Sequence, residues 1–217
     1  SPGNPGELQL MKEGERVGNY YTHAYAGIDD NGNWLVWNKD NTERIPIAEA
    51  NDDDKRVTGN GLPKFTMSWN NTFNYKNWDL SLYFRGAFGY DLYNVHDLYF
   101  GIQNVPGNVL KKAYDENAAI TTGANVLTDY FMENGDYLKL DAATLGYRFN
   151  LKSKWIEGIR LYATGTNLFT ITSFSGVDPT TIETNGLTPG VNTHDGNGTR
   201  RYYPTSTQLL FGIQLDF

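Results

Sequence analysis

Residues that could do acid–base, nucleophilic or metal chemistry are few and scattered in this sequence. The chain of 217 residues has no cysteine and three histidines, His23, His96 and His194. It has no H-E-x-x-H segment, which would place two histidines one helical turn apart for zinc. Catalysis needs several such groups in a defined mutual geometry. The sequence therefore predicts no catalytic residue, no metal site and no cofactor, and we expect a protein that is not an enzyme.

One segment has the spacing with which a calcium-binding loop begins. Asp29, Asn31 and Asn33 occupy alternate positions, but the turn position that should hold glycine is Trp34, and no glutamate follows six residues later. Asn31 is followed by glycine, and Asn-Gly is a strong hairpin signal. We therefore predict a hairpin turn here.

The overall composition limits the classes of partner. The formal net charge of −7 argues against nucleic acid, because its phosphates would be repelled. The mean hydropathy is −0.53, and no apolar run approaches the roughly 18 residues of a membrane helix. Membrane strands escape this test, because they hide their lipid face in alternate residues. The run Asp52–Asp54 is interpreted as a solvated loop segment, with cation binding as the alternative.

Aromatic residues outside the predicted long strands are candidates for ligand contact. Two follow the first strand and three lie in the longest loop: Trp34, Trp37, Tyr93, Tyr99 and Phe100. Aromatic rings stack on sugars or anchor protein interfaces. These residues are predicted to contact a substrate or a partner protein; the alternative is that they pack the loops against one another.

Long amphipathic strands are the elements that must position these residues. The last predicted strand, 203–217, carries apolar residues at alternate positions: Leu209, Phe211, Ile213, Leu215 and Phe217. This alternation indicates a β-strand, and roughly 9–11 residues let a tilted strand cross a membrane. The other long strands are predicted over 17–28, 62–75, 77–90, 137–149 and 159–172.

The connections between these strands alternate between short and long, which is typical of an outer-membrane barrel. Short turns are expected at 76–77 and 150–158, long loops at 38–61, 91–136 and 173–202, and helical pieces near 93–100 and 108–117. Within the predicted strand 137–149, the apolar residues move from even-numbered to odd-numbered positions, which predicts a bulge near Asp141-Ala142. If Phe217 lies on the periplasmic side, the short turns lie there too.

Each predicted strand has a polar and an apolar face. Tyr83, Arg85 and Tyr162 fall on the polar face and are predicted to face the barrel lumen, with a cross-strand ladder as the alternative. The aromatic residues near the short turns are predicted to gather at one membrane interface: Tyr75, Trp78, Tyr147, Phe149 and Phe217.

The predicted number of strands is too small for a closed barrel. About six strands are expected, whereas single-chain barrels begin at about eight and lipid does not tolerate open sheet edges. The first residues show no signal peptide. We therefore expect residues 1–217 to form the C-terminal portion of a larger barrel. A soluble carbohydrate-binding β-sandwich is the alternative, since a second sheet could cover the apolar face.

Several motifs carry a family resemblance. The segments GNGLPKFTMSWNNTFNYKNWDLSLYF, YLKLDAATLGYRF, TNLFT followed by GVDP, and YYPTSTQLLFGIQLDF together resemble the late strands of the SusC-like TonB-dependent transporters of Bacteroidetes. The resemblance implies a 22-stranded antiparallel transmembrane barrel in the outer membrane, with an N-terminal plug absent from these residues. Phe217 then ends the strand that barrel assembly recognises.

The resemblance also implies a function and partners. These are TonB-dependent uptake of oligosaccharides or oligopeptides, a SusD-like lipoprotein lid over the long loops, contact with the TonB complex through the absent N-terminal part, and a dimer of such pairs. The lid is then the partner protein for the loop aromatic residues. A siderophore- or vitamin-type TonB-dependent receptor, without a lid, remains the alternative.

Overall fold

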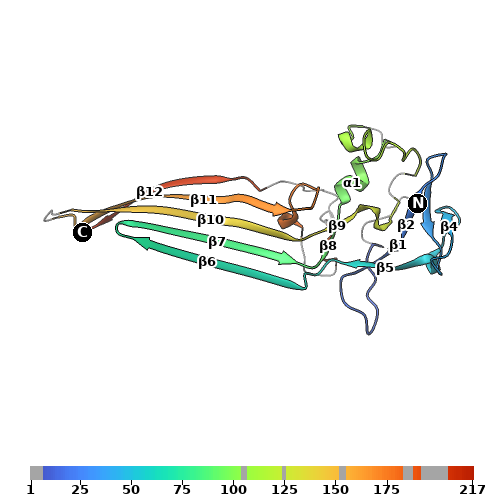
Figure 1. The fold of residues 1–217 in the computed structure, drawn as a ribbon, viewed down its shortest axis with the longest axis horizontal. Helices are drawn as coiled ribbons and strands as arrows, with labels where there is room; N and C mark the ends of the chain where they lie inside the picture. The colour runs from blue at the N-terminus through green and yellow to red at the C-terminus, as the bar shows by residue number, and fades with distance from the viewer. Residues whose placement is uncertain (1–6, 104–106, 124–125, 152–154, 183–187, 192–204) are drawn as a thin grey trace. The chain divides into compact units, whose positions relative to one another are not determined.

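The computed structural model describes residues 7–103, 107–123, 126–151, 155–182, 188–191 and 205–217. The chain divides into two units, which we call the loop unit and the sheet unit (Figure 1). The loop unit comprises Ser1–Lys64, Gly89–Gly135 and Ser173–Tyr203, and the sheet unit comprises Phe65–Phe88, Asp136–Thr172 and Pro204–Phe217.

The sheet unit is an antiparallel sheet of long strands. They are β6 (Phe65–Tyr75), β7 (Trp78–Phe88), β10 (Tyr137–Asn150), β11 (Gly158–Thr172) and β12 (Gln208–Asp216), in the order β12-β11-β10-β7-β6. Their lengths of 9 to 15 residues exceed the roughly 5–6 residues usual in soluble sheets. Five of the six predicted long strands are thus confirmed. The last begins later than predicted, at Gln208, and Tyr203 and Pro204 lie outside the described residues.

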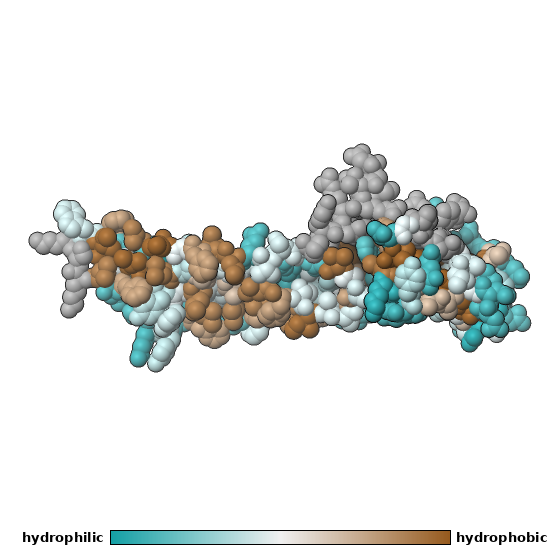
Figure 2. Space-filling model, turned by 90° about the horizontal axis from the view of Figure 1, so that it is seen from above, coloured by the Kyte–Doolittle hydropathy of each residue, from teal (hydrophilic) through white to brown (hydrophobic). Residues whose placement is uncertain are grey.

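The register brings the apolar residues of these strands onto one face. Leu82 lies opposite Asn71 on β6 and Ala143 on β10, and Ala143 lies opposite Gly165 on β11. Because directly opposed residues share a face, the alternation within each strand adds up to an apolar and a polar face of the whole sheet. Figure 2 shows hydrophobic residues gathered along the sheet, and many are exposed, such as Phe211 at 78%.

The predicted bulge is confirmed at Asp141. The register of β10 shifts between Leu140 and Ala142 against both β7 and β11. The extra residue keeps Leu140 and Ala143 on the same apolar face despite their odd spacing. The carboxylate of Asp141 forms an ion pair with Arg85 on β7.

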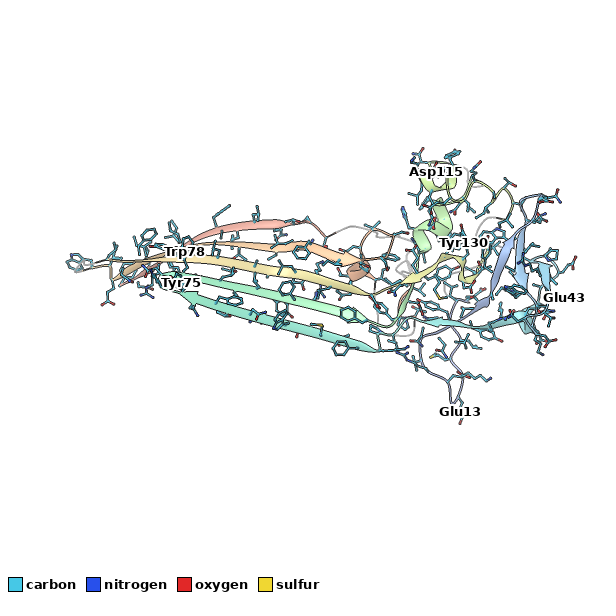
Figure 3. All side chains as sticks on the ribbon, in the orientation of Figure 1. Glu13, Glu43, Tyr75, Trp78, Asp115 and Tyr130 are labelled. Carbon is cyan, nitrogen blue, oxygen red and sulfur yellow. The ribbon has the colours of Figure 1, made fainter. Side chains whose placement is uncertain are left out.

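Aromatic residues gather at the end of the sheet that carries the short turns. Tyr75 pairs with Trp78 across the two-residue turn at Lys76-Asn77, whose Lys76 has φ of 55°, and both aromatic residues lie beside that turn (Figure 3). The ring of Tyr147 lies 4.7 Å from that of Trp78 and 4.6 Å from that of Phe149, measured between centroids. Tyr75, Trp78, Tyr147 and Phe149 thus lie close together, as predicted, and the position of this end at a membrane interface stays a prediction.

The loop unit contains short strands and helical turns. β1 (Asn19–His23) pairs with β5 (Lys55–Asn60), β2 (Tyr25–Ile28), β3 (Trp34–Trp37) and β4 (Arg44–Pro46) form a second sheet, and β8 (Asp91–Tyr93) pairs with β9 (Met132–Asn134). The helical segments are η2 (Asp52–Asp54), α1 (Val95–Phe100), η3 (Lys111–Ala113), η4 (Asp129–Phe131) and η5 (Pro179–Thr181). Of the two predicted helical pieces, the one near 93–100 is α1 and the one near 108–117 is reduced to η3. Among the described residues, no helix is both long and apolar enough to cross a membrane.

The prediction of one long strand over 17–28 is wrong. The segment is divided between β1 and β2, which belong to different sheets. Tyr20 and Thr22 are buried at 0% and 1% exposure, and their neighbours Asn19 and His23 are also buried. A strand covered on both faces does not show the one-sided exposure of a barrel strand. It belongs to the core of the loop unit instead.

Candidate functional site

The polar face of the sheet holds the residues that were predicted to face a lumen. Arg85 and Tyr83 on β7 oppose Ser68 and Asn70 on β6, and Tyr162 on β11 opposes Gly146 on β10. All three predicted residues therefore share one face of the sheet. Whether this face lines a lumen stays a prediction.

Ion pairs and hydrogen bonds join the strands across this face. Arg160 donates from Nε to Oδ2 of Asp79 at 2.9 Å, and its second bond reaches Oδ1 of the same carboxylate. A guanidinium that binds both oxygens of a carboxylate makes the strongest kind of surface ion pair. The hydroxyl groups of Thr144 and Thr164 lie 2.8 Å apart. These contacts form a ladder between strands on the same face as Tyr83, Arg85 and Tyr162.

Two of the five aromatic candidates are buried in the loop unit. Trp34 is 1% exposed, and its Nε1 donates a hydrogen bond to the carbonyl of Gly123 at 3.2 Å. Its ring packs edge-on against Tyr130 with centroids 5.4 Å apart. Tyr93 is 0% exposed, and its hydroxyl donates to the carbonyl of Thr128. Both residues pack the core, as the alternative interpretation held, and neither offers a face to a ligand in this structure.

The other three candidates are partly exposed. The guanidinium of Arg44 lies 5.4 Å from the centre of the Trp37 ring. Tyr99 packs against the core cluster, and the Phe100 ring lies 5.1 Å from that of His96. Trp37, Tyr99 and Phe100 remain the aromatic residues of the predicted set with surface available for a ligand or a partner.

A cavity that was not predicted from the sequence lies beside α1. It has a volume of about 360 Å³, and its lining includes Asn94, Asp97, Lys112, Glu116 and Ser175. Residues far apart in sequence meet there because Glu133 on β9 accepts hydrogen bonds from the side chain of Asn94 and from the backbone and side chain of Ser175. The sequence contains a local signal for helix α1 but none for the cavity. Asn94 is a favourable N-cap residue, and its side chain accepts a hydrogen bond from the backbone amide of Asp97.

A buried ion pair forms one wall of this cavity. The side chain of Asp97 is 4% exposed and accepts a hydrogen bond from Lys112 Nζ at 2.7 Å. Burial raises the pKa of Asp97 although Lys112 opposes that shift. For Lys112, burial is the largest single effect and lowers the pKa, but the hydrogen bond to Asp97 and the charges of Asp97, Glu133 and Glu116 together outweigh it, so the pKa of Lys112 is raised. The ion pair between Asp97 and Lys112 therefore involves a carboxylate that is almost completely shielded from water.

We expect Lys112→Met to lower the free energy of unfolding of the loop unit by about 1–3 kcal/mol, because it leaves the buried Asp97 carboxylate without its cation. Lys111→Met is the matched control, since Lys111 is 90% exposed and pairs with the exposed Asp115; it should cost less than about 0.5 kcal/mol. Hydrogen exchange of α1 measures both. Equal protection in the two variants would contradict the structural role of the pair.

The predicted hairpin at Asp29 is confirmed. The Oδ1 atom of Asp29 accepts hydrogen bonds from the backbone of Asn31 and Asn33, and Gly32 has φ of 80°. The carboxylate therefore stabilises the turn between β2 and β3.

The acidic run at Asp52–Asp54 also stabilises local structure. The carboxylate of Asp54 accepts bonds from the amides of Asn51 and Lys39, and Asp52 pairs with Lys55 at 2.7 Å. Within the described part of the chain, no group of three His, Cys, Asp or Glu side chains is placed to hold a metal ion.

His23 is the basis of a pH prediction for the loop unit. It is 9% exposed on β1, and its pKa is lowered, first by burial and then by Lys55. The folded state therefore favours the neutral ring. The stability from this residue is complete above the unfolded pKa near 6.5 and is lost as the pH falls towards the lower folded pKa. In the wild type, we expect the loop unit to become more sensitive to limited proteolysis as the pH falls from 7.5 to 5. In His23→Gln this increase in sensitivity should be smaller.

An antiparallel sheet of strands this long, apolar on one face and polar on the other, is typical of the wall of a membrane β-barrel. No family model matches the chain. The chain is 26% identical to TonB-dependent receptor P3 of Formosa agariphila, over 97% of the chain and 23% of the relative. It is 28% identical to TonB-dependent receptor SusC of Bacteroides thetaiotaomicron, over 100% of the chain and 21% of the relative.

Solved structures agree with these sequence matches. The RagAB peptide transporter superposes with a TM-score of 0.68 at 24% identity, over 93% of this chain and 23% of that one. The RagAB peptide importer in its open-open state gives 0.67 at 25% identity, over 92% and 22%. The resemblance to the SusC-like TonB-dependent transporters is thus confirmed, and the fold is that of part of their β-barrel. The chain spans about a fifth to a quarter of the length of these relatives.

Proposed function

We propose that residues 1–217 are the C-terminal barrel portion of a SusC-like, TonB-dependent importer of the outer membrane. The observation that carries this proposal is the sheet with one apolar and one polar face, in a chain that matches TonB-dependent receptors along its whole length. In this arrangement the apolar face contacts lipid and the polar face contacts the lumen. The short turns are periplasmic, and the loop unit is extracellular.

The residues then divide into three roles. Tyr83, Arg85 and Tyr162 face the lumen, where polar side chains line the path or contact a plug. Trp37, Tyr99 and Phe100 contact the substrate or a lid from the loop unit. A third set forms the terminal strand that completes the barrel: Leu209, Phe211, Ile213, Leu215 and Phe217.

The complete importer would take up oligosaccharides or oligopeptides. Its partners would be a SusD-like surface lipoprotein, which closes over the loop unit, and the TonB complex, which contacts the N-terminal part of the importer. Two such importer–lid pairs would form a dimer. Similarity to a protein named a peptide importer and to one named SusC supports this range of substrates and the lid. The chemistry of import is binding and translocation, with no reaction on the substrate.

The proposal is tested on the full-length parent protein. It should partition with outer membranes, migrate faster on a gel before heating than after it, and co-purify with a surface lipoprotein in mild detergent. Recovery of the parent in the soluble fraction without detergent would contradict the barrel. A membrane protein that purifies without any lipoprotein would contradict the lid and favour the siderophore- or vitamin-type receptor.

A further inference from the structure

Two ion pairs on the polar face join strands that are not neighbours in the sheet. Asp79 on β7 binds Arg160 on β11, although β10 lies between these strands. Arg148 on β10 binds Asp216 on β12 at 2.9 Å, although β11 lies between them. The two pairs overlap, so together they connect four consecutive strands of the sheet, from β7 to β12.

A glycine lies beneath each of these pairs. Gly146 on β10 is paired in register with Asp79, and a Cβ atom there would lie 2.6 Å from Nη2 of Arg160. Gly158 on β11 is paired with Asp216, and a Cβ atom there would lie 3.3 Å from Nε of Arg148 and from the Asp216 carboxylate. Because these positions lack a side chain, the charged groups can meet across the middle strand.

A third glycine accommodates an aromatic ring. Gly212 on β12 opposes Tyr162 on β11, and a Cβ atom at Gly212 would overlap the Tyr162 ring. The guanidinium of Arg160 lies 4.9 Å from the centre of the same ring. The ring is therefore placed between the first ion pair and the last strand.

The alternation of β12 does not by itself fix its register. A slip of two residues against β11 would keep every apolar side chain on the apolar face, because the side-chain period of a strand is two. Such a slip would, however, move Gly212 away from the Tyr162 ring and Asp216 away from Arg148. Only the native register of β12 satisfies both the Tyr162–Gly212 contact and the Arg148–Asp216 ion pair.

We propose that Arg148–Asp216 and Tyr162–Gly212 form a register lock that holds β12 in its native pairing, and that Asp79 supports the lock by holding Arg160 against the Tyr162 ring. The lock is a device for assembly of the barrel wall and is independent of what the importer carries. It acts on the polar face, where ion pairs between charged side chains can form, and leaves the apolar face free to contact lipid.

The lock is tested by crosslinking in the full-length parent, since this chain contributes no cysteine of its own. Thr164→Cys with Leu210→Cys reports the native register, because these residues oppose one another. Thr164→Cys with Gln208→Cys, and Thr166→Cys with Leu210→Cys, report the two slips by two residues. A disulfide needs Cα atoms within roughly 7 Å, so each pair reports its own register.

Asp216→Arg should raise the ratio of slipped to native crosslinks roughly tenfold or more, because it replaces attraction by repulsion. Arg148→Asp combined with Asp216→Arg should restore the native ratio. Asp216→Asn gives the same comparison without repulsion, should the reversed variant be degraded before insertion. An unchanged ratio in Asp216→Arg and Asp216→Asn, or failure of the exchanged pair to restore it, would overturn the proposal.

Discussion

Leu82→Arg is expected to lower the free energy of unfolding of the parent barrel by about 2–4 kcal/mol. Leu82 lies in the middle of β7 on the apolar face, opposite Asn71 and Ala143. An arginine there would place its charge among lipid tails near the middle of the bilayer, where hydration is lost. Chemical denaturation of the parent in lipid vesicles measures the change.

The adjacent residue is the matched control for this substitution. Ser81 lies on the polar face, opposite Thr72 and Thr144, so Ser81→Arg should cost less than about 1 kcal/mol because its charge stays in a polar surrounding. Similar costs for the two arginines would show that the faces of β7 are assigned incorrectly.

Trp34→Ala is expected to destabilise the loop unit by about 3–5 kcal/mol, the usual cost of removing a buried tryptophan. The side chain packs among aromatic neighbours that include Tyr25 and Phe131, and alanine would leave a cavity among them. Hydrogen exchange of β3 and of the segments that contact it measures the loss of protection.

Trp37→Ala tests whether Trp37 contacts a ligand or partner or only packs within the loop unit. Trp37 is on the same strand but is only partly buried, with Arg44 over its ring. We expect a small loss of protection, and a reduced affinity for the substrate or the lid if the proposed contact is correct. A loss of stability equal to that of Trp34→Ala would mean that Trp37 too is a packing residue.

The sheet unit could be predicted in detail because its determinants are local. A strand with one apolar face shows a period of two in its own sequence, and the changed parity around Asp141 located the bulge. The short turn at Lys76-Asn77 and the aromatic residues beside it were likewise visible in a few consecutive residues. The register between strands could not be predicted in this way. The roles of Gly146 and Arg160 depend on which residues lie opposite them, and this is known only once the strands are aligned.

The loop unit could not be predicted in the same way. Its short strands are stabilised by tertiary contacts between distant segments, and β-strand preference depends strongly on that context. The aromatic residues around Tyr20 suggested a membrane strand, but Tyr20 is buried in the core cluster of the loop unit and Tyr25 packs against the same cluster. The cavity beside α1 depends on Glu133 binding Ser175, a pairing across 42 positions that no sequence motif marks.

The facing of β7 in the membrane is the most direct test of the account. Single nitroxide labels at residues 79–85 of the parent barrel, reconstituted in lipid, would report the accessibility of each position to oxygen and to a water-soluble nickel complex. We expect high oxygen accessibility at Leu80, Leu82 and Phe84, and high nickel accessibility at Asp79, Ser81, Tyr83 and Arg85. A profile without a period of two, or with the two sets exchanged, would contradict a sheet whose apolar face contacts lipid.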